Sequence, residues 1–209
     1  MKKISIVDYG CGNTLSILRA LEEGGFSAKI TSDKNYILKS DFVILPGVGA
    51  YKKAMDLLNN FNLIDTIQEY ALGKKKPLLG ICLGMQLLLT KSFEMGEHNG
   101  LNLIKGIVKK LEPKKEIVKI PHINWSKIKL NDNLLDEINL KEFNDRYFYF
   151  VHSFISITEQ KNNTISFCKY YDLDIPSIIK KNNILGCQFH PEKSGKNGLN
   201  FLSKIITDL

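Results

Sequence analysis

Short apolar runs alternate with helical patterns through the first half of this 209-residue chain. The expected strands are residues 4–8, 27–31, 42–45 and 78–81. The expected helices are residues 14–23, a segment starting near residue 50, and residues 63–72 and 85–89. Parallel strands need helical crossovers and are buried on both faces, so they read as continuous apolar runs. The pattern therefore predicts an α/β fold with an open, mostly parallel central sheet flanked by helices.

The second half of the chain is rich in strand patterns. The expected strands are residues 106–111, 116–120, 146–151, 164–170, 176–180 and 184–188, with Asn182 and Asn183 as a hairpin turn. An amphipathic helix is expected at residues 198–207. No linker or internal repeat divides the chain, so residues 1–209 are expected to form a single domain with an additional antiparallel sheet in the second half.

The net charge of +7 raises the question of a nucleic-acid partner. The lysines are scattered among acidic residues, and no basic stripe is interleaved with aromatic side chains. A lysine-rich solvated surface accounts for the charge, so no nucleic-acid partner is expected. No apolar run has the length of a membrane span, and the apolar run at residues 4–7 is too short for a signal peptide. A cytoplasmic protein without a membrane partner is expected.

The segment Gly80-Ile81-Cys82-Leu83-Gly84-Met85-Gln86 follows one of the expected strands and precedes a helix. A nucleophile between glycines at a strand-to-helix turn is the nucleophile-elbow pattern, here with cysteine in place of serine. The tight turn requires small neighbours, which Gly80 and Gly84 provide. Backbone N–H groups at the start of the helix favour a thiolate. Cys82 is therefore the candidate nucleophile.

A cysteine nucleophile needs a base, and the base needs a partner that fixes its tautomer. Gln188-Phe189-His190-Pro191-Glu192 supplies both groups. Residues two apart in an extended segment point the same way, so His190 and Glu192 are expected on one face. Cys168 and Cys187 lie in strand-like runs and are expected to be small buried hydrophobes, whereas the role of Cys11 is open. No Cys or His spacing fits a metal, and Gly10 and Gly12 alone do not make a nicotinamide site.

These motifs resemble the class I (triad-type) glutamine amidotransferases, and within them the glutaminase subunits of histidine biosynthesis. The matching segments are residues 8–13, 45–50, 80–86, 121–125, 149–153 and 188–194. The resemblance implies a flavodoxin-like fold. It also implies that Cys82, His190 and Glu192 hydrolyse L-glutamine to glutamate and ammonia, without a cofactor or metal. The implied partner is a (β/α)8-barrel cyclase subunit that uses the ammonia to make imidazole glycerol phosphate and AICAR.

The resemblance also assigns further residues. It places the oxyanion hole at Gly47, Val48, Gly49 and Leu83, glutamine binding at Gln86, Val151, His152 and Ser153, and the partner interface with its ammonia gate at Asn13, Trp125, Tyr149 and Lys193. Trp125 is equally compatible with a buried core position. His122 and His152 are not needed for the triad and are expected to be hydrogen-bonded structural or interface residues.

The chain departs from the subfamily pattern in one segment. Where the subfamily reads Pro-His-Met-Gly-Trp-Asn, this chain has Ile123, Asn124 and Ser126 in place of Met, Gly and Asn. Asn tolerates a left-handed backbone, so a partner-facing turn is expected to persist here. The change motivates one alternative, a paralogous glutaminase that feeds another acceptor, such as a sugar amidotransferase. A further alternative is a non-catalytic flavodoxin-like binding subunit, and the intact set of Cys82, His190 and Glu192 argues against it.

Overall fold

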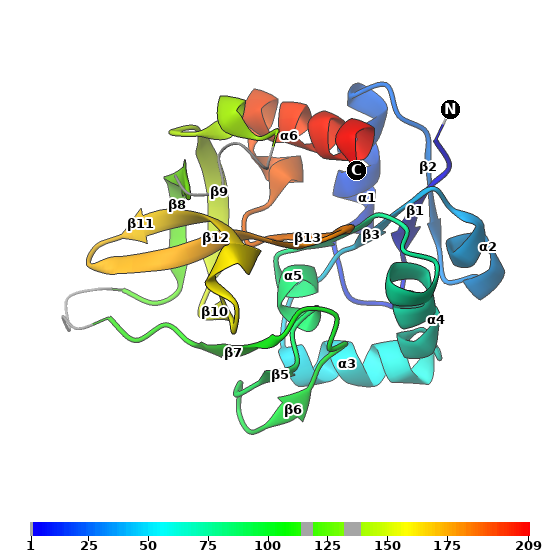
Figure 1. Cartoon of the computed structure of the whole chain (residues 1–209), viewed down its shortest axis with the longest axis horizontal. Coiled ribbons are helices and arrows are strands. Elements are labelled where there is room, and N and C mark those ends of the chain that lie inside the picture. The colour runs from blue at the N-terminus through cyan, green and yellow to red at the C-terminus, as the bar shows by residue number, and fades with distance from the viewer. Residues whose placement is uncertain (1, 114–118, 132–138) are drawn as a thin grey trace.

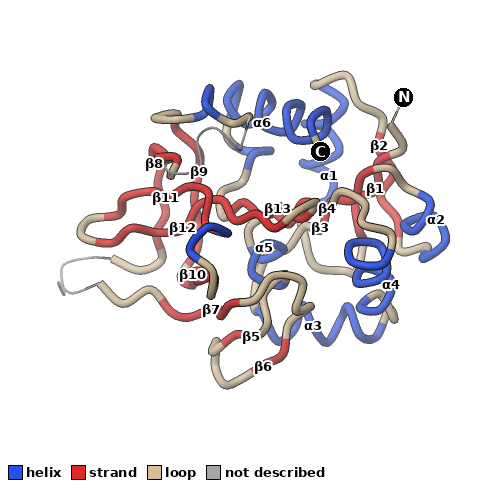
Figure 2. Tube along the Cα trace, in the orientation of Figure 1, coloured by secondary structure: helices blue, strands red, loops and turns tan. Residues whose placement is uncertain are grey.

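The computed structural model describes residues 2–113, 119–131 and 139–209. The described residues form a nine-stranded sheet in the order β2-β1-β3-β4-β13-β12-β11-β8-β9. Its parallel part contains β1 (Ile4–Val7), β2 (Ala28–Thr31), β3 (Phe42–Leu45), β4 (Leu78–Ile81) and β13 (Ile184–Cys187). The predicted mostly parallel α/β sheet is confirmed. Figure 2 shows its strands as one band across the molecule.

The remainder of the sheet is antiparallel. It contains β12 (Leu173–Lys181), β11 (Thr164–Tyr170), β8 (His122–Leu130) and β9 (Tyr147–His152). A smaller sheet in the order β10-β7-β5-β6 contains β10 (Phe154–Thr158), β7 (Gly106–Lys110), β5 (Lys91–Ser92) and β6 (His98–Asn99). The antiparallel extension is thus confirmed.

Helices cover both faces of the parallel strands (Figure 1). On one face lie α1 (Thr14–Glu23) and α6 (Gly195–Asp208). On the other lie α2 (Lys34–Lys39), α3 (Tyr51–Asn60), α4 (Ile64–Gln68), the π-helical turn η1 (Glu69–Gly73) and α5 (Leu83–Leu87). Alternate strand residues point to opposite faces. Ile4, Ile6 and Ile44 therefore pack with α1 and α6, whereas Val7 and Leu45 pack with α3, α4 and α5.

Several predicted elements differ from the structure. Helix α2 and strands β8 and β10 were not expected. The helix expected at residues 85–89 begins earlier, at Leu83, because the chain passes from the turn at Cys82 straight into the helix. Of the strand expected at residues 116–120, residues 116–118 lie outside the described residues, and residues 119–120 are not in a strand. The predicted hairpin turn at Asn182 and Asn183 is present between β12 and β13, and Asn182 has a φ of 53°.

Candidate active site

Cys82 occupies a strained turn between β4 and α5. Its φ of 55° and ψ of −110° lie in a region that residues with a side chain rarely adopt, at a cost of about 1–3 kcal/mol. The Cys82 N–H donates to the carbonyl oxygen of Cys187 at 2.8 Å, and the Gln86 N–H donates to the carbonyl oxygen of Cys82 at 3.3 Å. These two bonds hold the strained residue between the neighbouring strand and the new helix.

The glycines around Cys82 are required by close packing. A Cβ on Gly80 would lie 2.6 Å from the carbonyl oxygen of Gly84, and a Cβ on Gly84 would overlap the carbonyl oxygen of Leu45. Helix α5 therefore starts directly against the ends of β3 and β4. This contact is the physical reason for the glycine spacing seen in the sequence.

His190 reaches Cys82 because β13 and β4 are neighbouring parallel strands. The register pairs Cys187 with Ile81, so β13 and β4 end at the same edge of the sheet. Nδ1 of His190 lies 2.7 Å from Oε1 of Glu192, and both side chains are buried. The expectation of an extended His-Pro-Glu segment is wrong, because Pro191–Lys193 forms a 3₁₀ turn (η5). This turn, and not an extended segment, brings the Glu192 carboxylate to the His190 imidazole.

The charge state of His190 is set by its two neighbours. Burial alone would lower the pKa of this imidazole, but hydrogen bonding to Cys82 and Glu192, together with their negative charge, raises the pKa to about 10. Because Nδ1 is bonded to Glu192, Nε2 is the ring nitrogen left for Cys82. A protonated imidazole between a sulfur and a carboxylate is suited to deliver a proton to a leaving group.

A cavity of about 190 Å³ opens above Cys82 and His190. It brings together most residues expected in the oxyanion hole and the glutamine site, namely Val48, Gly49, Leu83, Gln86, Val151, His152 and Ser153. Gly47, the first residue of the same loop as Val48 and Gly49, does not line the cavity, and a Cβ on it would come within 2.8 Å of the Gly84 nitrogen. The predicted site residues therefore converge on one pocket at the carboxyl edge of the parallel strands.

Two residues of this cavity, Glu94 and Phe154, were missed from the sequence. Glu94 follows the short strand β5, and its Oε2 accepts from the Tyr51 N–H at 3.0 Å at the start of α3. No motif marks this carboxylate. The sequence shows only that Glu94 is an acidic residue in the segment that follows α5.

Gln86 is buried one helical turn beyond Cys82. Its Nε2 donates to the carbonyl oxygen of Phe154 and to Oε1 of Gln188, each at 3.1 Å. Gln188 in turn places its Nε2 3.7 Å from the Cys82 sulfur. The carbonyl oxygen of Phe154 and the side chain of Gln188 thus fix the amide of Gln86 in the wall of the cavity.

None of the four residues expected at the partner interface lines this cavity. Trp125 on β8 is 48% exposed, so the alternative of a buried core tryptophan is wrong. Its ring centroid lies 5.9 Å from that of Tyr149 on β9, and Lys193 is exposed in the turn after His190. Asn13 caps α1, where its side-chain oxygen accepts from the Ser16 N–H at 3.4 Å.

The turn expected around Asn124 is not present. His122–Leu130 forms β8, and Asn124 pairs with Phe150 of β9 in extended backbone. The cause is the pairing with β9, which buries His122 and Ser126 while Ile123 and Trp125 stay exposed. His122 and His152 are hydrogen-bonded to each other, Nδ1 to Nε2 at 3.1 Å, in agreement with the structural role expected for them.

The other cysteines behave differently from Cys82. Cys168 and Cys187 are buried as expected, and burial raises the pKa of both thiols. The Cys11 thiol donates to the carbonyl oxygen of Val48 at 2.7 Å, which ties the Gly10–Gly12 turn to the predicted oxyanion loop.

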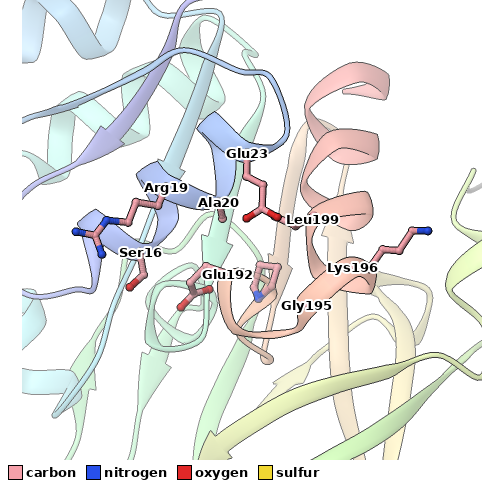
Figure 3. A pocket seen from close by; sticks show the side chains of 9 residues that line it. Ser16, Arg19, Ala20, Glu23, Glu192, Gly195, Lys196 and Leu199 are labelled. Carbon is pink, nitrogen blue, oxygen red and sulfur yellow. The ribbon is translucent and has the colours of Figure 1, made fainter.

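A larger cavity of about 510 Å³ lies on the other side of the triad, between α1 and α6. Figure 3 shows Glu192 in it, with Ser16 and Arg19 on α1 and Lys196 on α6. Cys82 and His190 do not line this cavity, so its size does not make it the reaction site.

The sequence of the chain matches that of a known protein family. The sequence model of the family Glutamine amidotransferase class-I matches residues 5–208. This chain belongs to the class-I glutamine amidotransferases. Among members of this family, the chain is 43% identical over 199 residues to proteins named Imidazole glycerol phosphate synthase subunit HisH from Bacillus cereus (strain AH187) and Bacillus anthracis (strain A0248). Each alignment covers 95% of this chain and 91% of the relative.

Solved amidotransferase structures share the fold. One titled "Crystal structure of glutamine amidotransferase" has a TM-score of 0.74 at 15% identity and covers 98% of this chain and 99% of that one. The structure of PurLQS from Thermotoga maritima has a TM-score of 0.73 at 22% identity, with 99% of each chain covered. At these identities the likeness concerns the fold alone.

Two features are absent from the described residues of this amidotransferase. None of the helices in the described part of the chain has the length and apolar character needed to span a membrane. Within the same residues, no group of three or more His, Cys, Asp or Glu side chains is arranged to hold a metal ion.

Proposed function

We propose that this chain is the glutaminase subunit of an imidazole glycerol phosphate synthase. In this role it hydrolyses L-glutamine with Cys82, His190 and Glu192 and passes the ammonia to a cyclase subunit. The observation that carries the proposal is the buried His190–Glu192 pair beside the strained Cys82, at the floor of a cavity of about 190 Å³. The subunit assignment is supported by 43% identity to the HisH relatives over nearly the whole chain.

The first half-reaction forms a thioester. The Cys82 sulfur attacks the side-chain amide carbon of glutamine, and the carbonyl oxygen takes up the negative charge. As the tetrahedral intermediate collapses, the C–N bond breaks and His190 gives its Nε2 proton to the departing nitrogen. Ammonia leaves, and the γ-glutamyl group stays on Cys82.

The second half-reaction regenerates the thiolate. His190, now neutral, takes a proton from water, and the resulting hydroxide attacks the thioester carbon. The C–S bond breaks, glutamate is released, and the imidazolium re-forms beside the sulfur. Glu192 Oε1, which lies 2.7 Å from Nδ1 in the structure, accepts the Nδ1 proton in both half-reactions, so Nε2 faces the reaction.

The oxyanion of both intermediates needs fixed N–H donors. The candidates are the Leu83 N–H at the start of α5 and an N–H of the Gly47, Val48 and Gly49 loop, which lies beside the cavity. Glycine at positions 47 and 49 lets a peptide in this loop turn toward the site, and Gly49 already has a φ of 96°.

The amino-acid end of glutamine needs charged and polar partners. Glu94 supplies a carboxylate in the cavity wall for the α-ammonium group. Val151, His152 and Ser153 line the same cavity, and we assign their backbone groups to the α-carboxylate. This placement leaves the side-chain amide of glutamine at the Cys82 end.

The partner surface is proposed to lie around Trp125, Tyr149, Lys193 and Asn13. An exposed tryptophan beside a tyrosine is typical of the aromatic anchors of protein interfaces. The partner expected there is the (β/α)8-barrel cyclase, because ammonia is retained for synthesis only if an acceptor covers the cavity.

The test combines biochemistry with genetics. The chain is purified with the cyclase subunit of the same organism, and glutamate release from glutamine is measured with the cyclase ligand present. Cys82→Ala is expected to lower the rate by at least about 10³-fold while the complex still forms. Cys168→Ala is the matched control, since Cys168 is also buried but lies in β11, away from the cavity.

Genetic complementation tests the acceptor. The gene is expected to restore growth without histidine in a strain that lacks this subunit, and the Cys82→Ala gene is expected to fail. Normal turnover by Cys82→Ala would contradict the nucleophile. Failure of the wild-type gene, with a sugar-modifying enzyme co-purified instead, would contradict the pathway and leave the glutaminase chemistry intact.

A further inference from the structure

A continuous series of hydrogen bonds joins strand β8, which lies between β11 and the edge strand β9, to the Cys82 sulfur. Ser126 Oγ lies 3.0 Å from His122 Nε2, and His122 Nδ1 lies 3.1 Å from His152 Nε2. His152 Nδ1 lies 2.9 Å from the carbonyl oxygen of Phe154. That same oxygen accepts from Gln86, which bonds to Gln188, whose Nε2 contacts the Cys82 sulfur at 3.7 Å.

The tautomers of both histidines follow from the partners. The carbonyl oxygen of Phe154 can only accept, so His152 carries its proton on Nδ1. Burial lowers the pKa of His152 to about 3 and that of His122 to about 4, so both rings are neutral and hold one N–H each. His152 Nε2 is therefore an acceptor, and His122 must donate to it from Nδ1. His122 Nε2 then accepts the Ser126 hydroxyl proton.

The direction of donation reverses at Phe154. Donors reach its carbonyl oxygen from His152 on one side and from Gln86 on the other. No proton can pass through an atom that only accepts, so the series is not a proton wire. The series can still fix the positions of its members, because each N–H or O–H group in it points at one acceptor and each ring has one orientation.

We propose that His122, which does not line the glutamine cavity, is a positioning residue for it. Through His152 it fixes the Phe154 carbonyl oxygen, and with it the amide of Gln86 in the cavity wall. The His122 ring is itself fixed by Phe150, with centroids 5.1 Å apart, and by Tyr170 at 4.1 Å. This role deepens the proposed function and rests on it, since the cavity is taken to hold the side chain and head group of glutamine.

Two substitutions at His122 separate positioning from folding. Asparagine places an amide nitrogen near the former Nδ1 and can still donate to His152, whereas glutamine places its amide near the former Nε2 and cannot. Both replace a buried imidazole by a buried amide. The expected result is that His122→Gln weakens glutamine recognition about tenfold, the effect of one lost buried hydrogen bond, and that His122→Asn restores most of it.

The probe is 6-diazo-5-oxo-L-norleucine, a glutamine-shaped electrophile that alkylates a cysteine nucleophile, used on the purified complex. Its half-saturating concentration is expected to rise about tenfold in His122→Gln. The rate of Cys82 alkylation by iodoacetamide, which has no amino-acid head group, is expected to stay within about twofold, because one lost bond far from the sulfur costs little there. Equal half-saturation in wild type, His122→Gln and His122→Asn would overturn the proposal, as would equal weakening in both variants.

A second measurement is independent of the glutaminase assignment. In ¹⁵N NMR spectra of the chain, His122 and His152 are expected to be protonated on Nδ1 and unprotonated on Nε2. The opposite tautomer on either ring would overturn the positioning role. If the probe fails to label wild-type Cys82 while both tautomers are as expected, the proposed function fails and the hydrogen-bond series stands.

Discussion

The backbone N–H of His190 donates to the carbonyl oxygen of Tyr149 at 2.9 Å, and the two ring centroids lie 6.5 Å apart. Tyr149 is in turn the cross-strand neighbour of Trp125. The imidazole of the proposed triad therefore lies directly beside the Trp125–Tyr149 pair, in which Trp125 is exposed and Tyr149 is half-buried. A partner that docks on this pair would contact the residue that holds the base in place.

Trp125→Ala is expected to weaken binding of the cyclase subunit at least about 30-fold, or about 2 kcal/mol, because a half-exposed aromatic anchor becomes buried on docking. The free energy of unfolding of the isolated chain is expected to change by less than about 1 kcal/mol, since Trp125 is 48% exposed. Isothermal titration calorimetry with the separately purified subunit measures the first effect. Leu72→Ala is the control, because Leu72 is equally exposed at the opposite end of the parallel strands. An unchanged dissociation constant for Trp125→Ala would remove Trp125 from the interface.

The pKa of His190 predicts a pH-dependent stability. The folded value of about 10 exceeds the value of 6.5 for an unperturbed histidine, so the folded chain binds the proton more tightly. This contribution is fully present below pH 6.5 and is lost as the pH rises through about 10. The difference in unfolding free energy between wild type and His190→Asn is expected to fall with pH across this window, by no more than about 1.4 kcal/mol per pH unit.

Urea unfolding of the two proteins at matched pH values measures this difference, and contributions from groups that do not interact with His190 cancel to first order. A difference that does not vary between pH 6.5 and 10 would show that the imidazole gains no proton affinity on folding.

Glu94→Gln is expected to raise the KM for glutamine at least about tenfold with kcat nearly unchanged, because a charged hydrogen bond to the α-ammonium group is lost while Cys82 and His190 are untouched. The amide can still accept from the Tyr51 N–H, so the start of α3 is preserved. Steady-state glutamate release by the complex measures both constants. Glu97→Gln, at an exposed side chain outside the cavity, is the control. A fall in kcat alone would place Glu94 elsewhere in the reaction.

Gly84→Ala is expected to destabilise the chain by about 3 kcal/mol, because the added methyl group overlaps the carbonyl oxygen of Leu45 and forces α5 away from β3. The shift also displaces Cys82, so glutaminase activity falls with stability. Gly73→Ala is the matched control, since its Cβ would meet only the Glu69 side chain at 3.5 Å. Thermal unfolding compares the two, and equal melting temperatures would contradict the close packing at Gly84.

The sequence was sufficient for the parallel half of the fold and for the convergence of Cys82, His190 and Glu192. Apolar runs bounded by glycine carry a strong local signal, and a nucleophile between glycines limits the turn it can adopt. Strand β8 was missed because its first half reverses the usual pattern, with His122 and Ser126 buried and Ile123 and Trp125 exposed, and because its pairing with β9 is not local. Glu94 was missed for the same reason, since only the folded chain brings its carboxylate to the cavity.

The position of β13 between β4 and β12 has a consequence for synthesis on the ribosome. Every other strand of the nine-stranded sheet precedes β13 in the chain, and His190 and Glu192 follow it. A nascent chain that ends before β13 holds the nucleophile without its base and leaves the sheet open in the middle. Glutaminase activity is therefore expected only after β13 has closed the sheet.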